Sequence, residues 1–252
     1  MNGAVTIPDA DAPAATGSEP LWESRVVLTP RDPAALRSIL GADMRRSDAQ
    51  FAHRMIWTLF PGAPAERRQG LFLFHVERNH PFTAIVRSRR TPQDGLGGVW
   101  TIERTRPFAP VLEAGQRLRF RLRAVANHWI AQPGAVRGRR VDVVTAAWDR
   151  LAEDERTPDR LEEAGEQAAL AWLARQGQRC GFAPRDGAVA VLNYDLTRLR
   201  PARRGKDIRF GALTFEGMLT VTDPVAMRTM LADGVGGGRA YGNGLMQIAP
   251  AP

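Results

Sequence analysis

The sequence predicts an α+β fold made of two tandem units, because one order of strands and helices begins twice along the chain. Short runs rich in β-branched and aromatic residues alternate with longer amphipathic segments, and turn residues separate them. The second unit has the order β-α-β-β-α-β, which is the ferredoxin-like order, and the first has a reduced version of it. We therefore expect two tandem ferredoxin-like (RRM-like) domains at residues 21–113 and 114–252, after a flexible leader at 1–20.

The first unit is expected to contain a strand, two helical segments and three further strands. They are Leu21–Leu28, Pro33–Leu40, Asp48–Phe60, Leu71–Arg78, Phe82–Arg87 and Val99–Arg104. The helix at 48–60 begins with a capping box, in which Ser47 is the N-cap and Gln50 the third helical residue. Pro61 ends that helix, and a turn that contains His80 is predicted between the second and third strands.

The second unit begins with a strand, Arg117–Ala124, that alternates strictly between arginine and apolar residues. The alternation places all the arginines on one face of the strand. A helix is expected after Thr157, with Pro158 at its first position and Gly177 past its end. The remaining elements are expected to be strands at Val189–Leu196 and Ile208–Thr222, a helix from Asp223 to Gly234, and a strand at Leu245–Ala249.

The charge balance favours a polyanionic partner. The formal net charge is +8 and Lys206 is the only lysine, so arginine carries almost all of the positive charge. Basic side chains that neutralise phosphates release counterions, which drives sequence-independent binding to nucleic acid. A GC-rich genome would explain the missing lysines but not the excess of basic over acidic residues. We therefore expect a nucleic-acid partner.

Several other classes of protein are excluded by composition. A single cysteine, Cys180, rules out a disulfide framework and a thiolate zinc site, and the four histidines are scattered without a metal-binding spacing. No apolar run approaches the length of a membrane span, and residues 1–20 lack the basic start and apolar core of a signal peptide. We expect no metal site, no cofactor, no membrane partner and a cytoplasmic location.

The glycine-rich segment 234–244 has six glycines in eleven residues. It follows a predicted helix and precedes a strand, which is the reverse of a dinucleotide-binding site, and it lacks the Gly-Lys-Ser/Thr of a P-loop. Two interpretations remain: a helix cap with a tight turn, or a backbone that lies close against a ligand. The second makes Gly236, Gly237, Gly238 and Arg239 candidate binding residues.

Two basic segments are candidates for phosphate binding, and the alternative for each is a solvated charged face. One is the arginine face of the strand at 117–124, and the other is the connection at 198–209, which contains a single acid, Asp207. The absence of other interleaved acids favours phosphate binding. The candidate residues are Arg119, Arg121, Arg123, Arg203, Arg204, Lys206 and Arg209.

Among the histidines, His53 is the main candidate for chemistry. It lies at the border of the apolar stripe of its predicted helix, one turn before Trp57, and the residues alone leave both a structural and a catalytic role open. His75 lies in an apolar strand and His80 in a turn, so a structural role is expected for both. The role of His128, after the arginine strand, stays open.

Taken in order, several segments resemble the CasE family, which processes CRISPR repeat RNA in type I-E systems. Those segments are Phe74–Arg78, Gly115–Ala124, Gly138–Val141, Phe215–Gly217 with Thr222–Pro224, and Gly234–Pro250. The segment from His53 to Pro61, HRMIWTLFP, is similar to the family's histidine-bearing helix. The family usually has a tyrosine three residues before that histidine, where this chain has Gln50.

The resemblance implies two ferredoxin-like domains that hold a repeat hairpin and cut RNA at its 3′ base without a metal. In that reaction the 2′-OH attacks the adjacent phosphate, which leaves a 2′,3′-cyclic phosphate and a 5′-OH. His53 would be the general acid or base, with arginines nearby to stabilise the phosphorane. Arg139, Arg140 and the segment 198–209 would hold the stem, and the glycine-rich loop its backbone.

The same resemblance implies that the guide RNA stays bound and that other Cascade subunits are partners. One alternative is a non-catalytic repeat-RNA-binding subunit of the same complex, which Gln50 in place of tyrosine would favour. Another is a small-molecule enzyme with a ferredoxin-like fold, but it would not explain the arginines.

Overall fold

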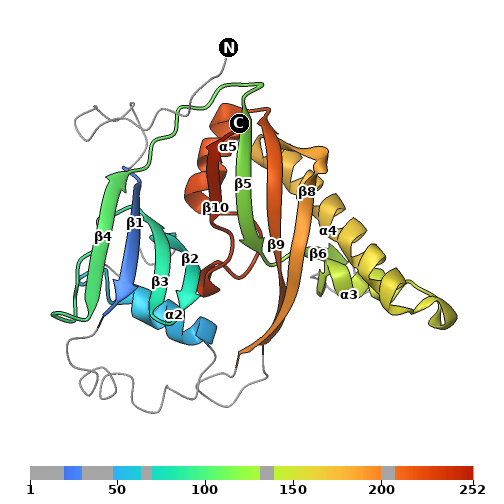
Figure 1. The fold of residues 1–252 in the computed structure, drawn as a ribbon, viewed down its shortest axis with the longest axis horizontal. Coiled ribbons are helices and arrows are strands. Elements are labelled where there is room, and N and C mark those ends of the chain that lie inside the picture. The colour runs from blue at the N-terminus through green and yellow to red at the C-terminus, as the bar shows by residue number, and fades with distance from the viewer. Residues whose placement is uncertain (1–19, 30–47, 64–69, 131–138, 200–207, 252) are drawn as a thin grey trace.

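The computed structural model describes residues 20–29, 48–63, 70–130, 139–199 and 208–251. Figure 1 shows two four-stranded antiparallel sheets side by side, which confirms the predicted α+β class. The first sheet lies within residues 22–107 and the second within residues 117–250. The domain boundary expected between residues 113 and 114 stays a prediction. None of the helices in the described ranges is both long enough and apolar enough to cross a membrane.

The first sheet is built from β1 (Trp22–Leu28), β2 (Phe72–Asn79), β3 (Phe82–Ser88) and β4 (Trp100–Pro107). Its order is β2-β3-β1-β4, and α2 (Asp48–Trp57) connects β1 to β2. A full ferredoxin-like unit would have a helix between β3 and β4, but residues 89–99 form a loop here. The carboxylate of Asp94 organises this loop by accepting hydrogen bonds from backbone N–H groups, including those of Val99 and Trp100.

The core of the first domain lies between α2 and one face of its sheet. The apolar stripe predicted on the helix is buried as expected, and it consists of Ala52, Met55, Ile56, Leu59 and Phe60. It packs with apolar strand residues such as Val26, Phe74 and Ala84. The helix predicted at 33–40 and the N-cap Ser47 lie outside the described residues.

The second sheet has the complete ferredoxin-like topology. Its strands are β5 (Arg117–Ala124), β8 (Phe182–Leu199), β9 (Ile208–Val221) and β10 (Met246–Pro250), in the order β10-β5-β9-β8. The helices α4 (Pro158–Cys180) and α5 (Pro224–Asp233) pack against one face of it (Figure 1). The alternation predicted for β5 is confirmed, because Leu118, Phe120 and Leu122 are buried while the arginines face outward.

The second domain contains an insertion that the sequence analysis missed. Between β5 and α4 lie a two-stranded sheet, β6 (Asn127–Ile130) with β7 (Arg139–Asp142), the helix α3 (Val143–Trp148) and the short 3₁₀ helix η3 (Glu153–Glu155). The side chain of Asp142 caps α3 by accepting hydrogen bonds from the N–H groups of Val144 and Thr145. Strands of four residues and a six-residue helix are too short to produce a clear periodicity.

The predicted end of α4 is wrong, and the predicted start of β8 is late. The helix continues through Gly177 to Cys180, and Gly181, with a φ of 76°, ends it in the left-handed conformation. Gly177 serves packing instead, because a Cβ there would lie 2.3 Å from the carbonyl oxygen of Phe182. The glycine therefore lets β8 begin directly against the helix, seven residues before the predicted Val189.

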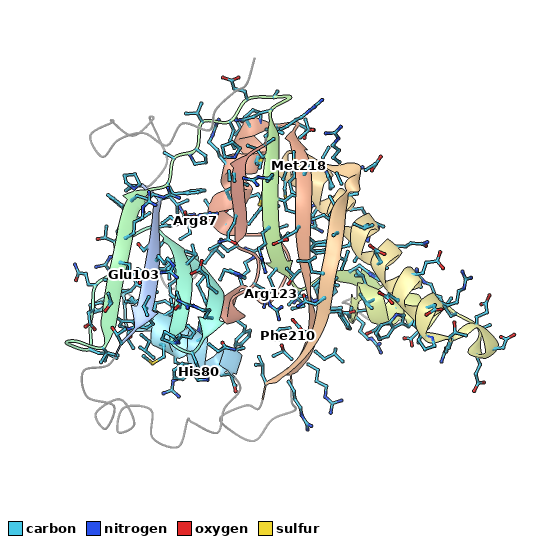
Figure 2. All side chains as sticks on the ribbon, viewed as in Figure 1. His80, Arg87, Glu103, Arg123, Phe210 and Met218 are labelled. Carbon is cyan, nitrogen blue, oxygen red and sulfur yellow. The ribbon has the colours of Figure 1, made fainter. Side chains whose placement is uncertain are left out.

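Arg87 joins the two domains. Its side chain is only 1% exposed, and it lies between the two sheets (Figure 2). The guanidinium donates hydrogen bonds to the carbonyl oxygens of Leu231 at 3.0 Å and Met246 at 3.1 Å, and to the carboxylate of Glu23 at 2.6 Å. It also lies over the ring of Phe108, 3.6 Å from the centroid. A buried cation held by groups from both domains favours one relative placement of the sheets.

Candidate functional site

His53 lies where α2 meets the glycine-rich segment of the second domain. The helix places its ring, which is partly exposed, at the border of the buried stripe, as the sequence predicted. Three aromatic rings surround it: the centroids of Trp57, Phe72 and Tyr241 are 6.2, 6.4 and 5.9 Å from that of His53. Tyr241 comes from the other end of the chain, so both domains form this site.

The hydrogen bonding of His53 defines its resting state. The indole Nε1 of Trp57 donates to Nε2 of His53 at 3.1 Å, so Nε2 is the acceptor and the neutral ring carries its proton on Nδ1. Nδ1 is buried and makes no hydrogen bond of ordinary geometry within the described residues. Burial lowers the pKa of His53 below its ordinary value, and an interaction with the backbone of Ala240 opposes this in part. The imidazole is therefore held in the unprotonated form.

The glycine-rich segment folds as a tight loop against its own domain and α2. It contains the 3₁₀ helix η4 (Arg239–Tyr241), and the N–H of Gly237 donates to the carbonyl of Val125 at 3.0 Å. Gly236 and Gly238 both have a positive φ, and a Cβ on Gly238 would lie 2.7 Å from the side chain of Val125. Close packing within the protein therefore accounts for these glycines without a ligand.

Polar side chains of the glycine-rich segment also stabilise it by hydrogen bonds to nearby backbone carbonyls. The guanidinium of Arg239 donates to the carbonyl oxygens of Gly236 and Asp233, at 3.2 and 2.8 Å. The amide of Asn243 donates to the carbonyl oxygens of Gly238 and Tyr241. These bonds hold Tyr241 beside His53, and they give Arg239 a structural contact in addition to its predicted role in RNA binding.

A basic cleft of about 600 Å³ runs between the two domains next to this site. Its walls come from α2, β2, the second sheet and the glycine-rich loop. The charged and titratable residues that line it are His75, Glu77, Arg78, Arg121, Arg123, Asp195 and Arg198, and Tyr241 lines it as well. A cleft with excess positive charge suits a phosphate-bearing ligand.

The arginine face of β5 is neutralised in part by acids from neighbouring strands. Arg121 pairs with Glu216 at 2.6 Å and Arg123 with Asp195 at 2.5 Å. The Nε of Arg119 donates to the carbonyl of Pro250 at 3.2 Å. These acids are not interleaved in the β5 sequence, because they belong to β9, the neighbour of β5, and to β8, the next strand of the sheet.

His75 is a site residue to which the sequence analysis gave only a structural role. It lines the cleft, and the alternation of β2 was the signal that could have found it, because Phe74 and Val76 face the core. Burial is the main cause that lowers the pKa of His75. The charges of Arg121 and Arg123 lower this pKa further, whereas the charge of Glu77 raises it. A phosphate bound near these arginines would therefore favour protonation of His75.

The other predicted residues that the structure describes lie on elements different from that of His53. Arg139 and Arg140 are exposed on β7, and the guanidinium of Arg140 lies 5.5 Å from the ring centroid of Trp129 on β6. Arg209 is exposed at the start of β9, opposite Arg198. The remaining basic candidates, Arg203, Arg204 and Lys206, lie outside the described residues.

The two other histidines do not line the cleft. His80 lies in the predicted turn between β2 and β3, and His128 pairs with Val141 in the β6–β7 sheet. Among the described residues, no group of three or more His, Cys, Asp or Glu side chains is placed to hold a metal ion.

Comparisons with known proteins agree on one family. The family model described as "CRISPR associated protein" matches residues 21–250. The CRISPR-associated endoribonuclease Cse3 of Thermus thermophilus is 28% identical over 249 residues, which cover 91% of this chain and 100% of that protein. The Cascade subunit CasE of Escherichia coli is 30% identical over 202 residues, or 79% of this chain and 90% of that protein.

The fold agrees as well. A solved structure of Thermus thermophilus Cse3 bound to an RNA that represents a pre-cleavage complex is similar with a TM-score of 0.66 and 28% sequence identity. The similarity covers 92% of this chain and 100% of that one.

Proposed function

Because the chain belongs to the CasE/Cse3 family of CRISPR-associated proteins, we propose that it is a metal-independent endoribonuclease that cuts CRISPR repeat RNA at the 3′ base of the repeat hairpin. The observation that carries this proposal is the position of His53, an imidazole with a lowered pKa, against Tyr241, which lines a basic cleft formed by both domains. A relative named as an endoribonuclease and a neighbour bound to RNA support the substrate class.

The reaction needs a group that accepts the proton of the 2′-OH and positively charged groups that stabilise the negative charge on the phosphorane. The 2′-oxygen of the substrate forms a bond to the phosphorus while the bond from phosphorus to the 5′-oxygen breaks. His53 takes the proton from the 2′-OH, and its lowered pKa keeps it able to do so near neutral pH. The 5′-oxygen takes a proton from water as it leaves, so the products are a 2′,3′-cyclic phosphate and a 5′-OH.

His53 must lose one hydrogen bond before it can accept a proton from the substrate. Its Nε2 is occupied by the indole of Trp57, and its Nδ1 is buried. Substrate binding would therefore replace the Trp57 hydrogen bond with one from the 2′-OH. Arg121 and Arg123 line the same cleft and would stabilise the charge that develops on the phosphorane.

We propose further that the cleaved guide RNA stays bound and that the protein is a Cascade subunit, as the name of the Escherichia coli relative suggests. Arg119, Arg139, Arg140, Arg203, Arg204, Lys206, Arg209 and the loop residues Gly236 to Arg239 keep their predicted role in holding RNA. The alternative, a repeat-RNA-binding subunit that does not cut, draws its support from Gln50.

The test is to incubate the protein with repeat RNA from its own genome, in magnesium and in EDTA. We expect cleavage at the 3′ base of the hairpin in both conditions, with a 2′,3′-cyclic phosphate at the new end. A 2′-deoxy substitution at the scissile nucleotide should stop cleavage and leave binding intact. Tight binding without any cleavage would support the non-catalytic subunit, and cleavage that EDTA abolishes would overturn metal independence.

A further inference from the structure

The hydroxyl of Tyr241 has no role in the chemistry proposed above. Its ring is stacked on Phe210, with centroids 5.8 Å apart and planes at 25°, and it is tilted at 52° against His53. Phe210 lies near the end of β9 that faces the cleft region, below Arg123 in Figure 2. The ring therefore already has aromatic partners within the protein, and the hydroxyl is the group that remains for a ligand.

Tyr241 lines the cleft, and its hydroxyl is not fully buried. Within the described part of the chain it makes no hydrogen bond, and it is absent from the buried polar atoms that lack a partner. Tyr241 and Gly242 both line the basic cleft together with Arg121 and Arg123. A phenol that is accessible, unpaired and next to arginines is placed to donate a hydrogen bond to a phosphate oxygen.

Backbone hydrogen bonds around Tyr241 fix the position of this residue. The N–H of Tyr241 donates to the carbonyl of Gly238 at 2.8 Å, and its own carbonyl accepts from the buried side chain of Asn243. Gly242, with a φ of 80°, then turns the chain away. A donor held in place before the substrate arrives costs little reorganisation during the reaction.

No other phenol competes for this role. The chain has two tyrosines, and the hydroxyl of the other, Tyr194, donates to the carboxylate of Asp142 at 3.0 Å. Burial and the neighbouring Asp142 raise the pKa of Tyr194 to about 12. Tyr194 packs with the core of the second domain, whereas its neighbours Asn193 and Asp195 line the cleft. The position one turn before His53 is Gln50, whose amide does not ionise near neutral pH.

We propose that Tyr241 is a further catalytic residue, whose hydroxyl donates a hydrogen bond to a non-bridging oxygen of the scissile phosphate while His53 takes the 2′-OH proton. This inference rests on the proposed endoribonuclease function. The hydrogen bond strengthens as negative charge builds on the phosphorane, so it accelerates the reaction more than it increases affinity for the substrate.

Tyr241→Phe tests this role, because it keeps the ring contacts with His53 and Phe210 and removes only the hydroxyl. Under single-turnover conditions, with the protein in excess over the repeat RNA and above the Kd, we expect cleavage to slow by about 10²-fold. The Kd for the 2′-deoxy substrate and the melting temperature should stay close to those of the wild type. Tyr194→Phe is the matched control, and its cleavage rate should be unchanged.

Sulfur substitution tests the same contact without a change in the fold. RNA with sulfur in place of one non-bridging oxygen at the cleavage site should react more slowly with the wild type, because sulfur is a weaker acceptor. That slowing should be much smaller with Tyr241→Phe, which no longer makes the contact. A role of Tyr241 in packing alone would leave the sulfur effect equal in both proteins.

The outcomes separate this inference from the function on which it rests. A wild-type protein that binds repeat RNA but never cuts it would overturn both. A wild-type protein that cuts, with Tyr241→Phe equally fast and equally sensitive to sulfur, would overturn only the role of Tyr241. A slow Tyr241→Phe protein with intact affinity and a reduced sulfur effect would support it.

Discussion

The indole of Trp57 donates a hydrogen bond to Nε2 of His53 across one turn of α2, at 3.1 Å. This bond stabilises the neutral imidazole, because a proton on Nε2 would face the N–H of the indole. It also occupies the nitrogen that would accept the proton of the substrate. Together with burial, Trp57 therefore favours the neutral imidazole, and it provides the contact that RNA must displace.

Trp57→Phe should raise the pKa of His53. The phenyl ring preserves much of the aromatic contact, but it cannot donate a hydrogen bond to the neutral imidazole. We therefore expect an increase in the pKa of His53, measured by NMR titration of the imidazole. His80, in its turn between β2 and β3, is the internal control. An unchanged His53 pKa would contradict the role of the indole.

His53→Ala should abolish most of the cleavage. Loss of a general acid or base costs roughly 10²–10⁴ in rate, whereas a border position on α2 should leave the fold and RNA affinity nearly unchanged. Single-turnover rates and the Kd for 2′-deoxy RNA measure the two effects separately. His80→Ala is the control, because His80 is exposed in the turn between β2 and β3 and does not line the cleft. If His53→Ala cuts at the wild-type rate, His53 has a structural role and His128 becomes the next candidate.

The pH dependence of cleavage should report His53. A base whose pKa lies below the ordinary histidine value is unprotonated at neutral pH and becomes protonated only in mild acid. The rate should therefore rise with pH, with a midpoint below pH 6.5, the unperturbed value, and then reach a plateau. Trp57→Phe should shift this rise to higher pH. A rise centred above pH 6.5 in the wild type would show that another group controls the rate.

Glu23→Gln should lower the free energy of unfolding and make it depend less on pH in the acidic range. Burial alone would raise the pKa of Glu23, but the charges and hydrogen bonds of Arg87 and Arg106 outweigh it and hold the pKa below its ordinary value. Such a carboxylate stabilises the fold above its unfolded pKa, and that stabilisation is lost as the pH falls through the folded value.

At neutral pH we expect Glu23→Gln to lose on the order of 3 kcal/mol, because Arg87 remains buried without its carboxylate. Urea unfolding at pH 7 and at pH 4 would measure the free energy of unfolding. The difference between its values at the two pH values should be smaller in the variant than in the wild type. Glu162→Gln, an exposed position on α4, is the control. Equal acid sensitivity in Glu23→Gln and the wild type would show that Glu23 does not cause it.

Changing both Arg139 and Arg140 to Ala should weaken RNA binding and reduce its dependence on salt. Each lost phosphate contact lowers the slope of log K against log salt by about 0.9, a value calibrated on duplex DNA. The Kd for 2′-deoxy RNA at several salt concentrations gives this slope. Arg160→Ala is the control, because Arg160 already pairs with Glu163 on α4. An unchanged slope in the double variant would mean that Arg139 and Arg140 do not contact phosphates.

Local patterns in the sequence were enough to predict most of the regular elements. The strict alternation of β5, the apolar stripe of α2 and the Asp223-Pro224 start of α5 depend on neighbouring residues only, and the structure has all three. The prediction failed where the deciding contact was distant. Gly177 looked like a helix end, yet its close contact with Phe182 makes it an internal packing residue.

The sequence by itself determined the fold class, the surplus of arginine and the border position of His53, because composition and periodicity are local properties of the chain. Only the tertiary structure placed Tyr241 beside His53, His75 on the cleft and acidic partners opposite Arg121 and Arg123. These pairs join segments far apart in the sequence. Their proximity follows from how the strands pair and how the buried contacts of Arg87 hold the two sheets together, which no local pattern encodes.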